Sequence, residues 1–369
     1  MSRLTLLHLG KYYPPVRGGM ETVLETLCRG ERARVDSRAL VLGTTPSTVH
    51  EVVDGVAVTR VRSFGTVGAV ALTPTLPWWL ANADADVIVL HEPNPMALLA
   101  YALVQPAAPL VVWVHSEVIR PRWQYRLFYE PLLTLALRRA ARIVVASPPM
   151  LGAPSLAPFR DKCVVVPYGI EPAPYTPIQN GETRPAAEPT VLFVGRLVAY
   201  KGLDILLRAL ERVPELRLDV VGSGPEGPRL RTLAQALAIT DRVRWYGEYP
   251  DEDLPRRMAD ADFLVLPSVT VEEMFGLVVL EAMAAGRPVI TTAVPSAVRE
   301  VNVPGVTGLE VPLRDVPALA QALESLSRDA ARRRTMGEAG RRRVAERFTQ
   351  AAMAERHIDL YQRIRGTKG

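Results

Sequence analysis

The chain alternates short apolar runs with longer segments of helical periodicity, and it repeats this alternation in two halves. In the first half, four runs have the length and apolar content of buried parallel strands, namely residues 4–9, 87–90, 110–114 and 143–146. Segments with helically spaced apolar residues, including 20–27 and 127–141, lie among them. This order predicts a doubly wound α/β domain over residues 1–172.

A proline-rich stretch, residues 173–189, separates the two halves and reads as a linker. Beyond it, strands are predicted at 191–194, 217–221, 243–246, 263–267 and 289–292, and helices at 203–213, 226–237, 254–260 and 277–285. The sequence therefore predicts a second Rossmann-like domain over residues 190–349. Two such domains that face each other would enclose a deep cleft at the carboxyl ends of their strands.

Composition narrows the class of protein further. At 369 residues the chain is too long for the usual single hydrophobic core. Its 48% hydrophobic and 22% charged residues exclude a disordered chain, and a formal charge of +5 favours anionic ligands or membrane surfaces. Cys28 and Cys163 match no metal-ligand or redox spacing, and no apolar run approaches the roughly 18 residues of a membrane span. We therefore expect a cytoplasmic protein.

Two glutamates, Glu273 and Glu281, lie beside the predicted start of one helix in the second half. Glu273 falls in the loop after a predicted strand, and Glu281 lies inside the apolar helix that follows. A carboxylate in a helix that is packed on several sides needs a hydrogen-bonding partner. A nucleotide sugar could supply hydroxyl donors, and its phosphates could bind the free N–H groups near Phe275, Gly276 and Leu277. Alternatively, Glu281 pairs with a basic residue and Glu273 is a solvated loop charge.

Two cations follow the first predicted strand of the second half. Arg196 comes directly after Gly195, and Lys201 opens the next helix. Cations at the carboxyl end of a strand could neutralise a diphosphate leaving group. The alternative for each is a surface charge or a structural ion pair. After the next strand, the run from Gly222 to Pro225 predicts a tight turn that lets a ligand approach the backbone.

In the first half, a diglycine and a histidine follow predicted strands. At Gly18 and Gly19 a phosphate could contact a helix N-terminus, although a simple turn would have the same sequence. His115 ends the strand at 110–114, a position facing the predicted cleft that favours a functional imidazole over a structural one. His91 also ends a strand, and we interpret it as a cleft-wall or structural residue.

Two arginine-rich segments are candidate interaction surfaces. The segment from Arg120 to Arg139 could lie on anionic lipid headgroups, or it could be an ordinary amphipathic helix that packs its leucines on the sheet. Residues 328–347 alternate arginines with glutamates and alanines and lack aromatic stacking residues, which predicts a solvated helical face and no nucleic-acid partner. No spacing typical of a metal site, a hydrolase triad or a Walker phosphate loop is present.

Together these motifs resemble the retaining glycosyltransferases of family 4, over essentially the whole chain. The most specific part is the run from Glu273 to Ile290, in which both glutamates and the small-residue helix have the family's spacing. Strings at 11–21, 114–116, 160–164 and 296–301 resemble a bacterial branch that builds surface polysaccharide of the O-antigen type and often transfers mannose. The chain departs from the family after Thr292, where a diglycine is common, and at Tyr168, which replaces a frequent asparagine.

The resemblance implies a GT-B fold, in which the last helix, about residues 350–369, packs back on an acceptor-binding N-terminal domain. The C-terminal domain would bind the nucleotide sugar. Glu281 would hold the ribose hydroxyls, Glu273 would contact the donor sugar, and His115 would lie beside the reacting centre. The donor diphosphate would be bound by Gly18, Gly19, Arg196 and Lys201 and by the amides near Phe275, Gly276 and Leu277.

The resemblance also implies the reaction. The acceptor would attack from the face on which the diphosphate departs, and the phosphate would receive the acceptor proton, without a protein nucleophile, a metal or a cofactor. The expected donor is GDP-mannose, with a UDP-sugar as the alternative, and the expected acceptor is a lipid-linked saccharide at the inner membrane face. Other hypotheses are a nucleotide-sugar-binding protein without transferase activity, or a nicotinamide-dependent oxidoreductase, for which the dinucleotide fingerprint is missing.

Overall fold

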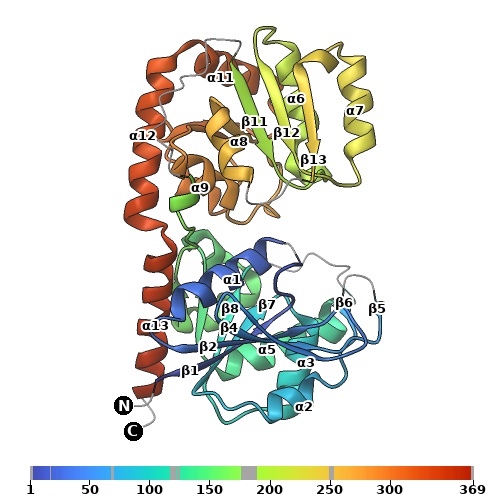
Figure 1. Ribbon diagram of the computed structural model, residues 1–369, viewed down its shortest axis with the longest axis vertical. Coiled ribbons are helices and arrows are strands. Elements are labelled where there is room, and N and C mark those ends of the chain that lie inside the picture. The colour runs from blue at the N-terminus through green and yellow to red at the C-terminus, as the bar shows by residue number, and fades with distance from the viewer. Residues whose placement is uncertain are drawn as a thin grey trace. The chain divides into compact units, whose positions relative to one another are not determined.

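The computed structural model describes residues 3–16, 18–67, 70–116, 123, 125–175, 189–248 and 253–366. The chain divides into two compact units: unit 1 is Met1–Gly169 with Gln350–Gly369, and unit 2 is Ile170–Thr349. The predicted α/β class is correct for both units, since each consists of a largely parallel sheet and covering helices (Figure 1). In the part of the chain that is described, no helix has both the length and the apolar character needed to cross a membrane.

Unit 1 contains an eight-stranded sheet of order β10-β9-β8-β7-β1-β2-β4-β3, in which only β3 and β4 pair antiparallel. A separate small hairpin consists of β5 (Thr66–Val67) and β6 (Val70–Ala71). The strands of the large sheet are β1 Thr5–Gly10, β2 Asp36–Leu42, β3 Val49–Val53, β4 Val56–Val61, β7 Val87–Glu92, β8 Leu110–Val114, β9 Ala140–Val145 and β10 Cys163–Val165. The strand order reverses between β7 and β1, which makes their carboxyl ends a topological switch point.

The helices of unit 1 include both early and late parts of the chain. The final helix, α13, contacts α1, so residues more than 300 positions apart in the sequence share one core. The helices are α1 Gly19–Glu31, α2 Leu76–Ala81, α3 Pro95–Val104, α5 Glu130–Arg139 and α13 Gln350–Gly366, with short 3-10 turns at Pro148–Gly152 and Pro154–Lys162.

The helix predicted at 127–141 differs from the structure at both ends. The π-helical turn η1 (Tyr125–Tyr129) comes first, and α5 begins only at Glu130. Pro131 lies in the first turn of α5, where a missing N–H breaks no intrahelical bond. At the other end, residues from Ala140 onwards pair with β8 as strand β9, so tertiary pairing ends the helix earlier than its periodicity indicates.

Unit 2 contains a six-stranded parallel sheet of order β13-β12-β11-β14-β15-β16. Its strands are β11 Thr190–Val194, β12 Arg217–Val221, β13 Val243–Gly247, β14 Phe263–Leu266, β15 Val289–Thr292 and β16 Gly308–Val311. Strand β16 was not predicted, because a four-residue strand that contains Gly308 and Glu310 has little apolar signal. The strand order reverses between β11 and β14, and this switch point is where an open parallel sheet binds its ligand.

The helices of unit 2 form two groups beside this sheet. In one group α6 contacts α7 and α11, and in the other α9 contacts α8 and α12 (Figure 1). A buried apolar cluster joins the strands to α6, α7 and α11. The helices are α6 Leu203–Glu211, α7 Gly227–Ala236, α8 Leu254–Asp260, α9 Leu277–Ala284, α10 Val298–Val301, α11 Val316–Arg328 and α12 Ala330–Arg347, with 3-10 turns at Ala173–Tyr175, Ala199–Lys201 and Thr240–Arg242.

The arginine-rich segment forms α12, and two of its arginines bind carbonyl groups at the ends of other helices. Arg333 donates to the carbonyl oxygens of Leu326 and Ser327 in α11, at 2.5 and 2.8 Å. Arg343 donates to the carbonyl oxygens of Glu300 and Val301 in α10, at 2.6 and 3.1 Å. The last carbonyls of a helix have no partner within it, so these guanidinium groups cap α10 and α11. At least these two arginines therefore stabilise unit 2 itself.

Candidate active site

Lys201 and Glu273 form a largely buried ion pair at the switch point of unit 2. Lys201 ends the 3-10 turn after β11, and Glu273 lies in the loop after the neighbouring strand β14. Lys201 Nζ lies 2.6 Å from Glu273 Oε2, and the two side chains are only 12% and 8% exposed. Ser268 Oγ donates to the same carboxylate oxygen at 2.7 Å. The two residues were each singled out from the sequence, but their pairing was not predicted.

The loops that carry this pair are fastened to each other. The backbone N–H of Val269 donates to the carbonyl oxygen of Tyr200 at 2.8 Å, which joins the loop after β14 to the loop after β11. Thr292 Oγ1, at the end of β15, donates to the carbonyl oxygen of Ser268. Gly202 has φ of +66°, and a Cβ there would overlap the carbonyl oxygen of Pro267, so only glycine permits this approach. The side chains are therefore held on a rigid base.

The turn after β12 packs against the same region. Gly222 has φ of +132°, and a Cβ at this position would overlap the carbonyl oxygen of Gly195 at the end of β11. The next residue, Ser223, donates its hydroxyl to Glu248 Oε1 at 2.7 Å. The loops after β11, β12 and β13 are thus brought together at one edge of the sheet, as expected for neighbouring parallel strands.

Arg196 differs from Lys201 although both follow β11. Its side chain is exposed, and within the described residues no hydrogen bond or ion pair joins it to another side chain. A structural ion pair was one alternative for both cations. Lys201 forms such a pair with Glu273, and Arg196 does not. A guanidinium that projects from the end of β11 is available to bind an anion.

Helix α9 begins near Glu273, and its first N–H groups have no partner within the helix. Gly276 precedes it with φ of +70°, in the left-handed conformation, and Phe275 is buried. Glu281 lies in the second turn and is half-buried, whereas Glu273 is buried. The alternative in which Glu273 is a solvated loop charge is therefore wrong, because its carboxylate is buried and bonded to Lys201 and Ser268.

The diglycine of unit 1 lies at the start of α1. Gly18 precedes the helix in an extended conformation, and a Cβ there would overlap the carboxylate of Glu21. Burial raises the pKa of Glu21, while Lys11 opposes this shift. A Cβ at Gly19 would meet open space. Because the carboxyl group of Glu21 already lies at the first turn, a phosphate at Gly18 would have to displace it. The assignment of Gly18 and Gly19 to the donor diphosphate stays a prediction.

His115 follows β8 as predicted, but it is only 5% exposed and both ring nitrogens are hydrogen bonded. Its Nδ1 lies 2.6 Å from the hydroxyl oxygen of Tyr168, and its Nε2 lies 2.9 Å from Nδ1 of His91. Burial, and then the nearby His357, lower the pKa of His115 to about 3. His115 is therefore an uncharged ring in a hydrogen-bonded chain, and a ring nitrogen must exchange one bond to contact a substrate.

The chain continues through His91 to His8 and Glu31, two residues that were not predicted from the sequence. His91 Nε2 lies 3.0 Å from His8 Nδ1, and His8 Nε2 lies 3.0 Å from Glu31 Oε2. His8 is in the apolar strand β1, and Glu31 is the last residue of α1. A polar side chain in the middle of a buried strand requires a buried partner. His8 could therefore have been recognised in the sequence by its position inside the apolar strand.

Two further sequence predictions concern surface chemistry and metals. Part of the arginine-rich segment that starts at Arg120 lies outside the described residues, which include 123 and 125–139. In the described ranges of the chain, no three His, Cys, Asp or Glu side chains converge on a point that could hold a metal ion.

Family models match both units. The model of the glycosyl transferase 4-like domain matches residues 18–169, and the model of glycosyl transferases group 1 matches residues 176–343. The chain is 31% identical to the D-rhamnosyltransferase WbpZ of Pseudomonas aeruginosa over 356 residues, which cover 94% of this chain and 92% of WbpZ. It is also 29% identical to the O-antigen chain mannosyltransferase C of Escherichia coli, covering 99% of this chain and 100% of the relative.

Solved structures agree with this assignment at the level of the fold. The sucrose-phosphate synthase of Thermosynechococcus elongatus is 25% identical and matches with a TM-score of 0.83 over 99% of this chain and 100% of that one. Anabaena HepE in complex with UDP, at 20% identity, matches with a TM-score of 0.76 over 97% of this chain and 100% of that one. The chain belongs to the family 4 glycosyltransferases, a retaining family that transfers sugar from nucleotide sugars, and it has the GT-B fold. The predicted family and fold class are confirmed.

Proposed function

We propose that this glycosyltransferase moves a hexose, in the first instance mannose from GDP-mannose, to a lipid-linked saccharide in the synthesis of a bacterial cell-surface polysaccharide. The observation that supports this most is the buried Lys201–Glu273 pair at the switch point of unit 2. The similarity to an O-antigen mannosyltransferase supports the choice of mannose and of a lipid-linked acceptor. A UDP-sugar is the alternative donor, and binding without transfer is the alternative activity.

The proposed chemistry begins with the leaving group. As the bond between the sugar and the diphosphate breaks, negative charge builds up on the phosphate oxygens. Lys201, the exposed Arg196 and the N-terminal amides of α9 together supply the positive charge that stabilises it. Stabilisation of this kind is usually the largest single contribution to catalysis. No nucleophile from the protein is needed, because the acceptor hydroxyl attacks from the face that the diphosphate leaves and gives its proton to the phosphate.

The remaining site residues select and orient the donor. Glu281 is half-buried on α9 and accepts hydrogen bonds from the ribose hydroxyls. Glu273 is already bonded to Lys201 and Ser268, so its free lone pairs are those offered to the sugar hydroxyls. His115 of unit 1, with Gly18 and Gly19, completes the set as proposed from the sequence. We propose that the N-terminal unit binds the acceptor.

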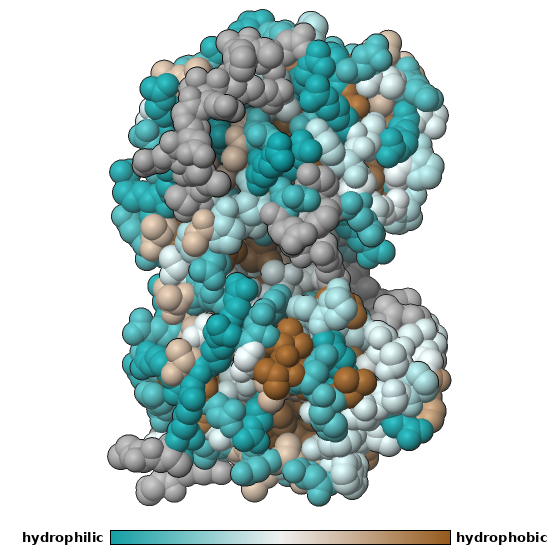
Figure 2. All heavy atoms as spheres, viewed as in Figure 1, coloured by the Kyte–Doolittle hydropathy of each residue, from teal (hydrophilic) through white to brown (hydrophobic). Residues whose placement is uncertain are grey.

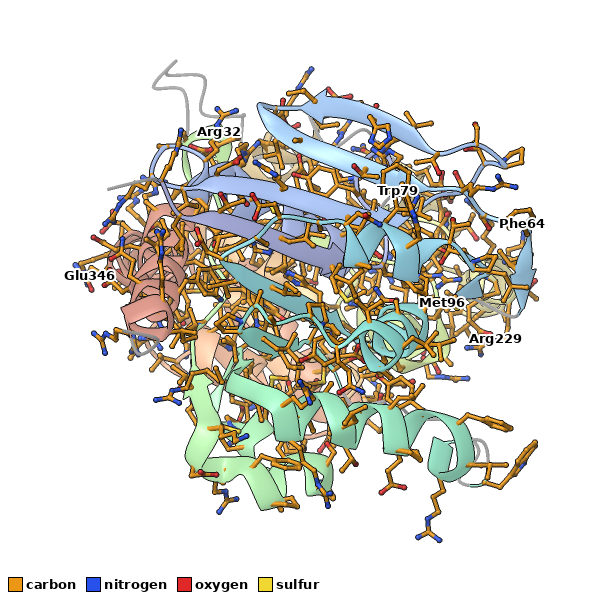
Figure 3. The ribbon with its side chains drawn as sticks, turned by 90° about the horizontal axis from the view of Figure 1, so that it is seen from below. Arg32, Phe64, Trp79, Met96, Arg229 and Glu346 are labelled. Atoms are coloured by element: carbon orange, nitrogen blue, oxygen red, sulfur yellow. The ribbon has the colours of Figure 1, made fainter. Side chains whose placement is uncertain are left out.

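Unit 1 also carries apolar side chains that suit a membrane-linked acceptor. Helix α3 contacts α2, α5 and β6, and Figure 3 places Phe64, Trp79 and Met96 on one side of the unit. Brown patches interrupt the hydrophilic surface of unit 1 in Figure 2. Exposed apolar residues of unit 1 include Trp78 of α2, Leu103 of α3, Leu127 and Phe128 of η1, and Phe64 in the loop before β5. Exposed arginines of the same unit are Arg62, which lies over the Phe64 ring, Arg126 of η1, and Arg138 and Arg139 at the end of α5. This combination is typical of peripheral contact with anionic lipid, and we propose such contact at the inner membrane face.

The donor and acceptor are tested together. We expect GDP to raise the melting temperature more than UDP or ADP does, because a ligand of the folded state stabilises it by about 2.7 kcal/mol at a hundred times its dissociation constant. We expect mannose transfer from GDP-mannose to a polyprenyl-diphosphate-linked saccharide, faster when the acceptor is in anionic vesicles than in neutral ones. If the protein binds nucleotides but transfers sugar from no donor, it is a nucleotide-sugar-binding protein and the proposed transferase activity is wrong. Equal rates in both vesicles would contradict the lipid contact.

Replacing Glu281 tests the ribose assignment. We expect Glu281→Gln to weaken GDP binding about tenfold, because a charge-assisted hydrogen bond to the ribose is lost, and to change kcat by less than about threefold. The measurement is a calorimetric titration with GDP and with inorganic pyrophosphate, which has no ribose. Glu272→Gln, in the exposed loop next to Glu273, is the matched control. If Glu281→Gln weakens pyrophosphate as much as GDP, the ribose assignment is wrong.

A further inference from the structure

The buried side chains around His115 form one continuous chain of hydrogen bonds across unit 1. From the protein interior outwards it consists of Glu31, His8, His91, His115 and Tyr168, linked at 3.0, 3.0, 2.9 and 2.6 Å. The three histidines are no more than 5% exposed, and Glu31 is fully buried. Each imidazole uses both ring nitrogens, so no link can change without affecting the next.

The residue at the inner end sets the direction of these bonds. Glu31 Oε2 lies within hydrogen-bond distance of His8 Nε2 and of Ser37 Oγ, at 3.0 and 3.2 Å, and a carboxylate oxygen accepts from both. His8 therefore carries a proton on Nε2, and in its neutral form it has its lone pair on Nδ1. A neutral imidazole has one donor and one acceptor nitrogen, so the same polarity passes to His91 and then to His115. At the outer end, His115 Nδ1 accepts from the Tyr168 hydroxyl.

Burial favours the uncharged form of the two outer rings, His91 and His115. Burial lowers the pKa of His91, and the neighbouring His115, His8 and His357 lower it further. Helix α13 faces the chain with His357, whose pKa burial lowers to about 4, and with Tyr361, whose pKa burial raises. Helix α1 adds Cys28, whose pKa burial raises, and β8 adds the uncharged ring of Trp113. Glu31 is thus the carboxylate that ends the chain on the inner side.

We propose that Glu31 is a positioning residue: through His8 and His91 it holds His115 in the tautomer with its proton on Nε2, so that the Nδ1 lone pair faces Tyr168. The consequence for catalysis rests on the proposed function. A sugar hydroxyl that takes the place of the Tyr168 hydroxyl must donate to His115, so the ring recognises a hydroxyl donor and cannot protonate the leaving group. Glu31 acts on the reaction without touching the substrate.

The test reads the tautomers directly. Protein labelled with ¹⁵N-histidine gives long-range ¹H–¹⁵N spectra in which protonated and unprotonated ring nitrogens differ. His50 and His357 lie outside the chain, and the variants His50→Gln and His357→Gln identify their signals. In the unsubstituted protein we expect His8, His91 and His115 all to carry the proton on Nε2 and the lone pair on Nδ1. A proton on Nδ1 of His115 would overturn the proposal without reference to any enzymatic activity.

Two substitutions at opposite ends of the chain separate cause from effect. The amide of Glu31→Gln can either donate or accept, so we expect two sets of ring signals for all three histidines. Tyr168→Phe removes the outer hydroxyl, and we expect it to leave the Nε2 tautomers unchanged because Glu31 still sets the direction. Glu25→Gln, the same change on the same helix, is the control and leaves the spectra unchanged. Unaltered tautomers in Glu31→Gln, or altered ones in Tyr168→Phe, would show that Glu31 does not set the direction.

The two proposals can fail separately. If the tautomers are as described and no donor supports transfer, the positioning network is present and the proposed function is wrong. If transfer occurs and the tautomers differ, the function stands and Glu31 is not the positioning residue. Where Glu31→Gln does not fold, the spectra of the unsubstituted protein and of Tyr168→Phe still decide the proposal.

Discussion

Replacing Lys201 with methionine is expected to lower kcat/KM about 10³-fold, because the departing diphosphate loses its buried cation. The same change leaves the Glu273 carboxylate buried without its ion-pair partner, which destabilises a protein by about 3 kcal/mol. A loss of activity alone would therefore not separate catalysis from folding. The measurement is kcat/KM for the donor together with the free energy of unfolding from urea titration.

The double variant Lys201→Met/Glu273→Gln separates the two effects. A neutral glutamine no longer needs the ammonium group, so we expect most of the lost stability to return. Activity stays about 10³-fold low, because the cation at the leaving group is still missing. Arg208→Met, which removes an exposed cation from α6 of the same unit, is the control and leaves both quantities unchanged. Recovery of activity in the double variant would show that the ion pair is only structural.

Acidification is expected to unfold unit 1 before unit 2. All five histidines of the chain, at positions 8, 50, 91, 115 and 357, belong to unit 1. Burial lowers the pKa of His115 to about 3 and that of His357 to about 4, from an ordinary value of 6.5. Below pH 6.5 the unfolded chain therefore binds more protons than the folded one, and stability falls as the pH falls. At pH 3 the loss is roughly 4 kcal/mol for His115 alone, a large part of a domain's stability.

Hydrogen exchange followed by mass spectrometry between pH 7 and pH 4 locates this unfolding, because peptides of the two units are read separately. We expect peptides of the β1, β7 and β8 strands to lose protection first. His357→Phe removes one buried proton acceptor while it keeps a ring beside Trp113, and we expect it to restore roughly 3 kcal/mol at pH 4. His50→Gln, at an exposed histidine, should change nothing. Earlier loss of protection in unit 2 would contradict the prediction.

A carboxyl group of the same unit acts in the opposite direction. Burial raises the pKa of Glu92 to about 8, from 4.5, and the Tyr129 hydroxyl and the Asn94 backbone N–H oppose this shift only partly. The folded state therefore binds the proton more tightly, and the stability that Glu92 contributes is lost as the pH rises towards 8. Protonation of the histidines destabilises unit 1 as the pH falls below 6.5, and ionisation of Glu92 destabilises it as the pH rises towards 8. These opposite effects give unit 1 its greatest stability at an intermediate pH.

The sequence located most of the candidate site but not its contacts. Motif spacing identified Arg196, Lys201, Glu273 and the start of α9 as separate features of one sheet edge. Their relation depends on the strand order, because only the pairing of β11 with β14 brings Lys201 and Glu273 within 2.6 Å across 72 positions of sequence. Periodicity describes one segment at a time and contains no information on which strands are neighbours.

The hydrogen-bonded histidines show the same limit. His115 was predicted because it follows a strand, but the partners of its nitrogens come from β7 and from the residues after β10. The chain then continues to β1 and α1. The register of the strands places His91 two residues beyond the partner of His8, and His115 two residues beyond the partner of His91, so successive histidines are within reach of each other. The packing of α1 adds Glu31. The sequence suggested an imidazole open to substrate, whereas the folded unit holds both nitrogens in bonds.

The sequence by itself determined the α/β class, the family and the loops that carry charged residues, because each of these is a property of local pattern and composition. The tertiary structure alone decided which charges meet, which carboxylate is buried and which proton each buried ring keeps. These depend on strand order, register and helix packing, which bring together groups that are distant in the chain and remove them from water.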